Sequence, residues 1–181
     1  REWIAGHGLG FAQVEGNPRK MIEGRATGDW LASGRSGLRF VKGFREVMGG
    51  ILQQAVSDAW QAVQGADFLI ASSLGYYPVS SIAEKTGQPW VQTFLQPIFP
   101  TRAFPSALFP VPVRLGGLGN LLTHSIGGLL FWQMIRPGMN RARREVLGLP
   151  PLDLKGPFPR TERQKIPALY GYSSAFIPRP A

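Results

Sequence analysis

The sequence contains no cysteine, so it can hold neither a disulfide framework nor a zinc site with cysteine ligands. Acidic residues are also few: 11 Asp and Glu stand against 20 Lys and Arg, which gives a formal net charge of +9. This excess permits contact with phosphate, anionic lipid or nucleic acid but selects none of them. Because no nucleic-acid reader motif accompanies the charge, we expect no nucleic-acid partner. Charge-driven binding of nucleic acid or phosphoinositide stays a rival hypothesis, and it predicts steep weakening with salt.

A long unbroken hydrophobic run is lacking as well. The one long uncharged stretch lies between Arg114 and Arg136, and its length would span a bilayer. It holds five glycines together with polar residues such as His124 and Gln133, so it predicts a soluble helix preceded by a loop. The remainder has a globular balance, since 44% of the 181 residues are hydrophobic and 17% are charged.

Two long helices are predicted where apolar residues recur every three or four positions. The first runs from Leu38 to Val63, and the second runs from Leu118 to Leu147, where Pro137 should break or kink it. Residues 16 to 37 are rich in glycine and mixed charge, which indicates a surface excursion with a short helix near Arg19 to Glu23.

A strand, helix and strand follow the first long helix. The strands are the apolar runs Asp67 to Ser73 and Trp90 to Leu95, and the helix between them runs from Tyr77 to Thr86 before Gly87 ends it. Brief connectors between these elements are typical of a βαβ unit, so the two strands should be parallel.

The remaining segments complete an α/β fold. The chain opens in the end of a helix at Gly6, a short strand is predicted at Leu9 to Val14, residues 153 to 166 are interpreted as polar linker, and 168 to 173 as a last strand. The fold class is therefore an incomplete Rossmann-like parallel sheet flanked by helices. Since the first strands of such a sheet are expected before Arg1, the strand at 9–14 should not pair with the strand at 68–71.

The segment from Gln96 to Pro105, called the proline loop below, follows a buried strand directly. Pro97, Pro100 and Pro105 fix φ and lack amide donors, so the loop is preorganised. Open α/β sheets bind ligands beyond the carboxyl ends of their strands. We therefore predict that this loop and the helix carrying His124 form one wall of a binding pocket. The candidate binding residues are Phe94, Phe99 and Phe104 for apolar surface, Gln96 and Thr101 for orientation, and Arg102, His124, Ser72 and Ser73 as further polar groups.

Each candidate also has a structural interpretation, and the sequence leaves both open. His124 can be packed or hydrogen-bonded inside the fold, and the serines can cap a helix. Arg102 can pair with an acid instead of a phosphate. The phenylalanines can be ordinary core residues.

Short motifs along the whole chain resemble, in their order, the N-terminal acceptor-binding domain of a sterol 3-β-glucosyltransferase or related UDP-sugar glycosyltransferase of the GT-B fold. The most specific block is Leu95-Gln-Pro97 with Pro100-Thr-Arg-Ala-Phe-Pro105. The others are His7-Gly-Leu-Gly-Phe11 leading to Glu15-Gly-Asn-Pro18, Gly65-Ala-Asp67, Ile82-Ala-Glu-Lys85, Arg141 to Pro151, and Leu169-Tyr-Gly-Tyr172.

The resemblance implies transfer of a sugar, usually glucose, from a UDP-sugar to a hydroxyl of a sterol or another lipophilic acceptor. It implies inversion at the anomeric carbon, with no required metal and no cofactor beyond the UDP-sugar co-substrate. In the family, the catalytic His or Asp lies upstream of the residues matched here, and the nucleotide-sugar domain lies downstream. Residues 1–181 are thus expected to be a partial acceptor-binding domain that contains no catalytic residue and transfers no sugar by itself.

The expected partners follow from the same resemblance: a lipophilic acceptor and the missing C-terminal nucleotide-sugar domain. The basic group Arg136, Arg141, Arg143 and Arg144 is either a solvated helix face or a contact with anionic membrane, so the expected location is cytoplasmic, with peripheral membrane contact left open. The alternative function is a non-catalytic lipophile-binding or anionic-membrane-binding module.

Overall fold

The computed structural model describes residues 2–15, 37–106, 115–175 and 177. The predicted excursion at 16–37, with its helix near Arg19, falls outside these residues except for Gly37. In chain order the elements are α1 (Glu2–Gly6), α4 (Gly37–Ala62), β1 (Leu69–Ala71), α5 (Tyr76–Thr86), β2 (Trp90–Phe94), α6 (Gly116–Glu145), α7 (Phe158–Arg163) and β3 (Ala168–Tyr170).

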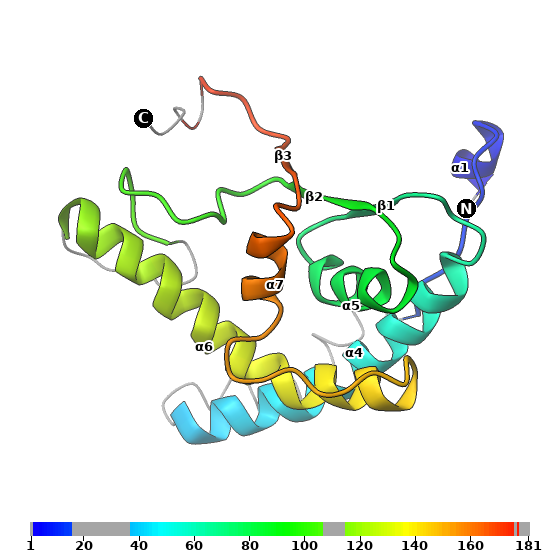
Figure 1. Ribbon diagram of the computed structural model, residues 1–181, viewed down its shortest axis with the longest axis horizontal. Helices are drawn as coiled ribbons and strands as arrows, with labels where there is room; N and C mark the ends of the chain where they lie inside the picture. Colours follow the sequence, from blue (N-terminus) through cyan, green and yellow to red (C-terminus); the bar gives the residue numbers. More distant parts are fainter. Residues whose placement is uncertain (1, 16–36, 107–114, 176, 178–181) are drawn as a thin grey trace.

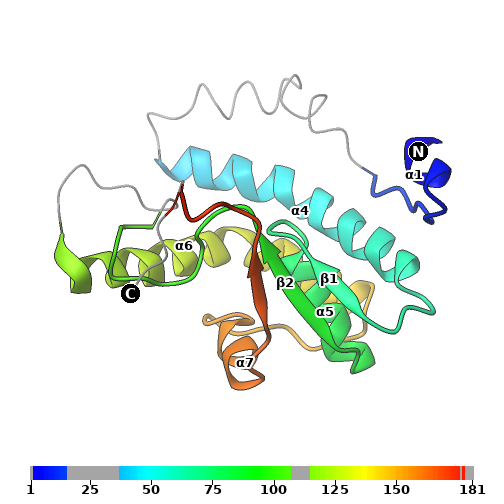
Figure 2. The same cartoon turned by 90° about the horizontal axis from the view of Figure 1, so that it is seen from above.

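The three strands form one parallel sheet in the order β1-β2-β3 (Figures 1 and 2). The predicted βαβ unit and the α/β fold class are confirmed, and Gly87 ends α5 as expected with a φ of 73°. Leu69 and Trp90 are in register and both are buried, on the face that α5 covers. Ile70, which points to the opposite face, is 67% exposed. Among the described residues, helices therefore cover one face of the sheet much more fully than the other.

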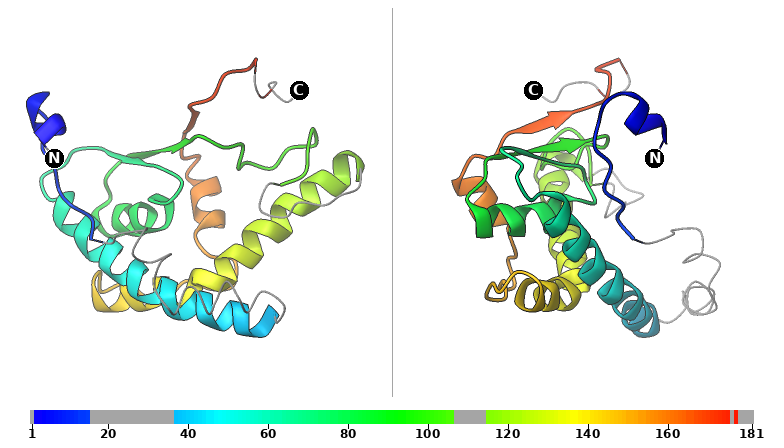
Figure 3. Two further views of the ribbon diagram at one scale, coloured as in Figure 1. Left: turned by 180° about the vertical axis from the view of Figure 1, so that it is seen from behind. Right: turned by 90° about the vertical axis from the view of Figure 1, so that its right-hand side faces the viewer.

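The two predicted long helices are confirmed as α4 and α6, which pack against each other below the sheet. The two helices approach closely at Gly138 and Gly49, since a Cβ built on Gly138 would lie 2.8 Å from the Gly49 Cα. α6 continues through Pro137 without a break, yet it changes direction in its second half (Figures 1 and 3). Proline therefore bends this helix without ending it. In the part of the chain that the structure describes, no helix is both long and apolar enough to cross a membrane.

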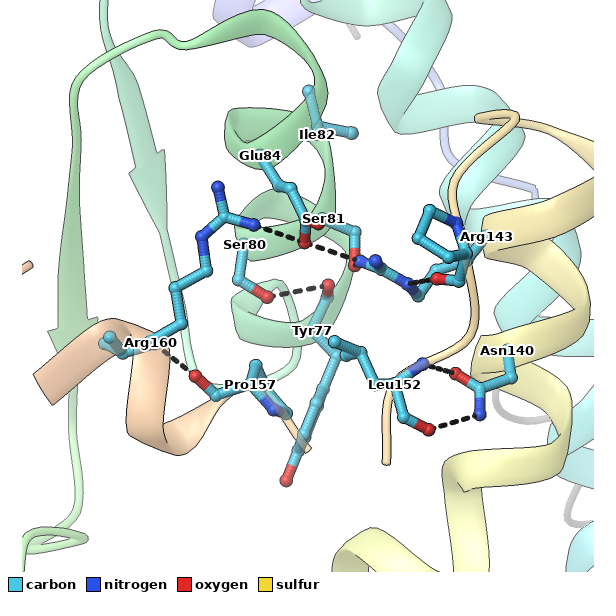
Figure 4. A network of polar contacts seen from close by, with 12 residues as sticks. Tyr77, Ser80, Ser81, Ile82, Glu84, Asn140, Arg143, Leu152, Pro157 and Arg160 are labelled. Carbon is cyan, nitrogen blue, oxygen red and sulfur yellow. Dashed lines mark hydrogen bonds and ion pairs between the residues drawn. The ribbon is translucent and has the colours of Figure 1, made fainter. Parts of the chain in front are cut away.

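The core lies between α4, α5, α6 and the sheet. Val56, Ile82, Trp132, Ile135 and Leu147 are among its most buried side chains. A polar network crosses this region, in which Arg143 of α6 and Arg160 of α7 both reach Glu84 of α5 (Figure 4). Arg143 therefore belongs to the interior, and the expectation that it forms part of a solvated or membrane-facing basic group is wrong.

Two further sequence predictions are wrong. Residues 9–15 form no strand and are exposed. A strand forms only where a neighbouring strand accepts its backbone hydrogen bonds. The related prediction that residues 9–14 do not pair with residues 68–71 is confirmed, because in the described chain β1 is hydrogen-bonded only to β2. The predicted linker at 153–166 contains α7, whose six residues are too few to show helical periodicity and which includes a proline in its first turn.

Candidate functional site

A hollow of about 520 Å³ opens at the carboxyl edge of the sheet, where the three parallel strands end together. We call it the strand-end hollow. Residues that follow β1, end β2 and end β3 line it: Ser72, Ser73, Leu74, Thr93, Phe94, Leu95, Gln96, Leu169, Tyr170 and Gly171. The predicted position of a binding site at this edge is therefore matched by a concave surface.

Large apolar side chains form much of this surface and are open to solvent. Leu74, Leu95 and Leu169 are all exposed, Leu95 by 72%. Solvated leucines gathered around a hollow are unfavourable for an isolated surface and are typical of a site that binds an apolar partner.

Hydroxyl and amide groups stand among these leucines. The Ser73 Oγ donates a hydrogen bond to the Gln96 Oε1 at 3.1 Å, which joins the residues beyond β1 and β2. The Thr93 Oγ1 donates to the Ala71 carbonyl at 3.2 Å. Acids and histidines are missing from the described residues that line the hollow. These described residues can therefore hold an apolar molecule and orient a hydroxyl, but they include no ordinary general base.

Three aromatic rings meet beside the hollow. The ring centroids of Phe94 and Phe99 lie 5.9 Å apart, those of Phe94 and Tyr170 6.0 Å, and those of Phe99 and Tyr170 6.2 Å. The Phe99 amide also donates to the Tyr170 hydroxyl at 3.2 Å. Burial, together with the neighbouring Tyr172, raises the pKa of Tyr170 despite this bond, so its hydroxyl is neutral at physiological pH. Tyr170 thus attaches the proline loop to β3.

The far end of the proline loop is bound to α6 instead. The Asn120 Nδ2 donates to the Arg102 carbonyl at 2.8 Å, and the Ser106 amide donates to the Thr123 Oγ1 at 2.8 Å. The His124 Nε2 lies 3.2 Å from the Phe104 carbonyl. The loop therefore does lie on the helix that carries His124, as predicted.

The nine candidate residues divide into two groups. Ser72, Ser73, Phe94 and Gln96 line the hollow, and Phe99 joins them through its ring contacts. The second group, consisting of Thr101, Arg102, Phe104 and His124, lies where the loop meets α6 and is not part of the lining. Their role in binding stays a prediction for both groups.

The structural interpretation fits His124 in the second group, whereas the acid partner that it requires for Arg102 is not found among the described residues. His124 is buried, and its Nδ1 has no partner among the described residues. The Thr101 Oγ1 accepts the Ala103 amide, so the hydroxyl is used within the loop. The Arg102 side chain lies against Gly117, and within the described ranges it forms no ion pair with an acid.

Sequence reasoning missed Leu74, Leu95, Leu169 and Tyr170 as lining residues. Each stands at or just beyond the end of a strand, so the rule that placed Ser72 and Ser73 would have found them once β3 was known to pair beside β2. Within the described residues, no three His, Cys, Asp or Glu side chains gather closely enough to hold a metal ion.

Proteins named sterol 3-beta-glucosyltransferase match the chain over nearly its full length. The protein from Debaryomyces hansenii is 34% identical over 177 residues, which are 98% of this chain and 11% of that protein. The protein from Komagataella phaffii is 33% identical over 178 residues, 98% of this chain and 14% of that protein. The protein from Candida albicans is 32% identical over 177 residues, again 98% of this chain and 11% of that protein.

No protein-family model matches the sequence. The chain spans only a small part of the length of the relatives that it matches, although nearly all of its own length is matched. At about one identical residue in three over this length, chance similarity is excluded, and the chain is homologous to one segment of the sterol 3-beta-glucosyltransferases.

Proposed function

We propose that this chain is the acceptor-binding part of a glycosyltransferase that moves a hexose, usually glucose, from a UDP-sugar to a hydroxyl of a sterol or another lipophilic alcohol. One observation carries the proposal: a chain homologous to sterol 3-beta-glucosyltransferases has an open apolar hollow at the carboxyl edge of its parallel sheet. The leucines and the aromatic rings would contact the body of the acceptor. Ser73 and Gln96 would orient its hydroxyl.

The reaction requires a base and a UDP-sugar site besides the acceptor surface. The acceptor oxygen forms a bond to the anomeric carbon, the bond from that carbon to the diphosphate oxygen breaks, and UDP leaves from the opposite side of the sugar. The hydroxyl proton passes to a base. Because the described residues of the lining include no acid or histidine, we assign the base and the UDP-sugar site to other parts of the whole protein.

Sterol binding by the chain itself tests the acceptor assignment. A fluorescent sterol such as dehydroergosterol should bind and be displaced by unlabelled sterol, whereas UDP-glucose should not bind measurably. Replacement of Leu95 by Asp would introduce a charge at the hollow and should weaken sterol binding by about tenfold or more. Leu154→Asp is the matched control, because Leu154 is similarly exposed but does not line the hollow. Equal effects of the two substitutions, or tighter binding of UDP-glucose than of sterol, would refute the assignment.

A non-catalytic lipophile-binding module is the second candidate function. The described residues of the lining include no acid or histidine, and a module that binds a lipophile without reacting needs no more than such a surface. Transfer of radiolabelled glucose to sterol by the whole protein separates the two candidates, because only the first predicts labelled product.

A further inference from the structure

Three leucines lie exposed in a row along the first half of α6. They are Leu118, Leu122 and Leu129, whose exposed fractions are 74%, 59% and 45%. Spacings of four and seven place all three on one side of a helix. We call them the leucine row. Figures 1 and 2 show that this half of α6 extends away from the sheet.

The second half of the same helix is packed quite differently. Trp132, Ile135 and Met139 are almost fully buried in the core. Because Trp132 follows Leu129 by three positions, the leucine row continues the core side of α6 into the half of the helix that the core does not cover. Leucine at these solvated positions is not needed for folding, since a polar residue could stand there as well. The row therefore points to a partner for this side of the helix.

Basic side chains stand at both ends of the leucine row. Arg102 lies against Gly117 in the first turn of α6, where a Cβ on the glycine would be 3.2 Å from the Arg102 Cβ. Beyond the row, the Arg45 guanidinium donates to the Gln133 carbonyl at 3.1 Å, and Arg136 follows Leu129 at helical spacing of seven. In the sequence, residues 85–144 contain no Asp or Glu at all. Within residues 85–144, which include the whole row, every charged side chain is thus basic.

We propose that the leucine row docks on the surface of an anionic lipid bilayer. The leucines enter the boundary between headgroups and acyl chains, and Arg102, Arg45 and Arg136 lie at the level of the phosphates. An exposed apolar stripe with basic residues around it has the composition of an interfacial helix. A second copy of the chain fits less well, because it would bring two cationic rims together.

The opposite side of the same half-helix connects this surface to the strand-end hollow. Asn120, Thr123 and His124 are buried there and hold the proline loop. Docking through the leucine row would therefore bring the loop, and with it the hollow, close to the membrane from which a sterol is taken. In this respect the inference rests on the proposed acceptor function.

A single labelled cysteine tests the docking directly, because the natural chain has none. The Leu122→Cys variant, carrying an environment-sensitive fluorophore, should show a blue-shifted emission with vesicles that contain about 30% phosphatidylserine, and a much smaller shift with neutral vesicles. Leu9→Cys is the matched control, since Leu9 is 63% exposed but lies outside α6. A label at position 122 that stays in water while the protein binds vesicles would overturn the proposal. So would a shift without vesicles, which would indicate a second copy.

A substitution that leaves the net charge unchanged separates the contribution of the leucines to vesicle binding from that of the positive charge. In a vesicle sedimentation assay, the double variant Leu118→Ser and Leu122→Ser should bind anionic vesicles more weakly, on the order of tenfold, while Leu154→Ser binds like the unaltered chain. Both residues are solvated, so folding should be retained, and circular dichroism checks this. Unchanged binding by the folded double variant would refute docking through the row. Vesicle binding and sterol binding are measured separately, so either proposal can fail while the other stands.

Discussion

The guanidinium group of Arg143 on α6 lies 3.0 Å from the carboxylate of Glu84 on α5, inside the protein (Figure 4). Only 1% of the Arg143 side chain is exposed, and its other donors bond the Ser81 Oγ at 2.9 Å and the Pro150 carbonyl at 3.0 Å. Arg160 on α7 lies 2.7 Å from the same carboxylate. One glutamate therefore connects three helices.

Replacement of Arg143 by Ala should destabilise the chain strongly. The substitution leaves Ser81 and one side of Glu84 without a partner and opens a cavity, and loss of one member of a buried pair typically costs about 3–5 kcal/mol. Urea unfolding measures the loss. Arg141→Ala is the control, because Arg141 and Glu145 are both largely exposed and 4.0 Å apart, and such pairs contribute less than about 1 kcal/mol. Similar losses for the two variants would contradict a structural role for the buried pair.

Stability should fall at acidic pH because of Glu84. Burial by itself raises the pKa of this carboxyl group, but the hydrogen bonds and charges of Arg143 and Arg160 outweigh burial and hold the pKa below its ordinary value of 4.5. The unfolded chain therefore takes up the proton first as the pH falls, so the stabilisation is complete above about pH 5 and is lost as the pH falls through the lowered pKa. In the Glu84→Gln variant, the free energy of unfolding should depend less on pH between 5 and 3. Parallel pH profiles for the two proteins would exclude Glu84 as the source.

Two glycines of α6 should respond in opposite ways to alanine. A Cβ at Gly138 would meet the Gly49 backbone at 2.8 Å, and neither backbone can move without separating α4 from α6. Gly138→Ala should therefore destabilise the chain by about 1–3 kcal/mol. A Cβ at Gly128 would have no atom within 4 Å. Gly128→Ala should stabilise the helix by about 0.5–1 kcal/mol, and thermal unfolding of both variants checks the difference in sign.

The sequence predicted those elements whose cause is local. Periodic apolar residues identified α4 and α6, and the βαβ unit followed from two apolar runs and from Gly87, whose φ is 73°. The strand at 9–14 was predicted from composition, but strand formation depends on a neighbouring ladder that no local pattern reports. Likewise, the burial of Arg143 depends on Glu84, 59 residues away, and an arginine near the end of a helix looks solvated in the sequence alone.

The candidate site was predicted in part for the same reason. Ligands of open α/β sheets bind beyond the carboxyl ends of the strands, and this rule correctly located Ser72, Ser73 and Gln96 at one edge of the sheet. The direction of the parallel strands determines which edge that is. The rule could not say how the proline loop folds back. Hydrogen bonds from Asn120 and Thr123 draw its second half onto α6, so Thr101 and Phe104 lie away from the hollow.

Under the proposed function, the Tyr170 hydroxyl should help to position the proline loop in the whole protein. Tyr170→Phe keeps the ring beside Phe94 and Phe99 but leaves the Phe99 amide without its acceptor. Loss of one such bond costs about 1 kcal/mol, which corresponds to about a fivefold higher KM for the sterol acceptor, with the KM for UDP-sugar unchanged. Tyr170→Ala should weaken acceptor use further. If Tyr170→Phe matches the unaltered enzyme and only Tyr170→Ala is impaired, the ring and not the hydroxyl positions the loop.

Replacement of Phe99 or Phe104 by Ala should weaken acceptor use while sparing donor binding, and the two variants should do so for different reasons. Phe99 is half exposed and packs with Phe94 and Tyr170 beside the hollow, so its loss removes acceptor surface and two ring contacts worth about 0.5–1.5 kcal/mol each. Phe104 lies by His124, where the loop meets α6, so its loss should act through the position of the loop.

Steady-state kinetics of the whole protein, with sterol and UDP-sugar varied in turn, separate these effects. Phe99→Ala should lower kcat/KM for sterol by about tenfold and lower the melting temperature by only about a few degrees, because it removes two ring contacts but the side chain is already partly solvated. Phe104→Ala should lower both the melting temperature and acceptor use. If Phe99→Ala unfolds the protein, or if it impairs UDP-sugar binding while sterol affinity is unchanged, then the loop is structural and the strand-end hollow is not the acceptor site.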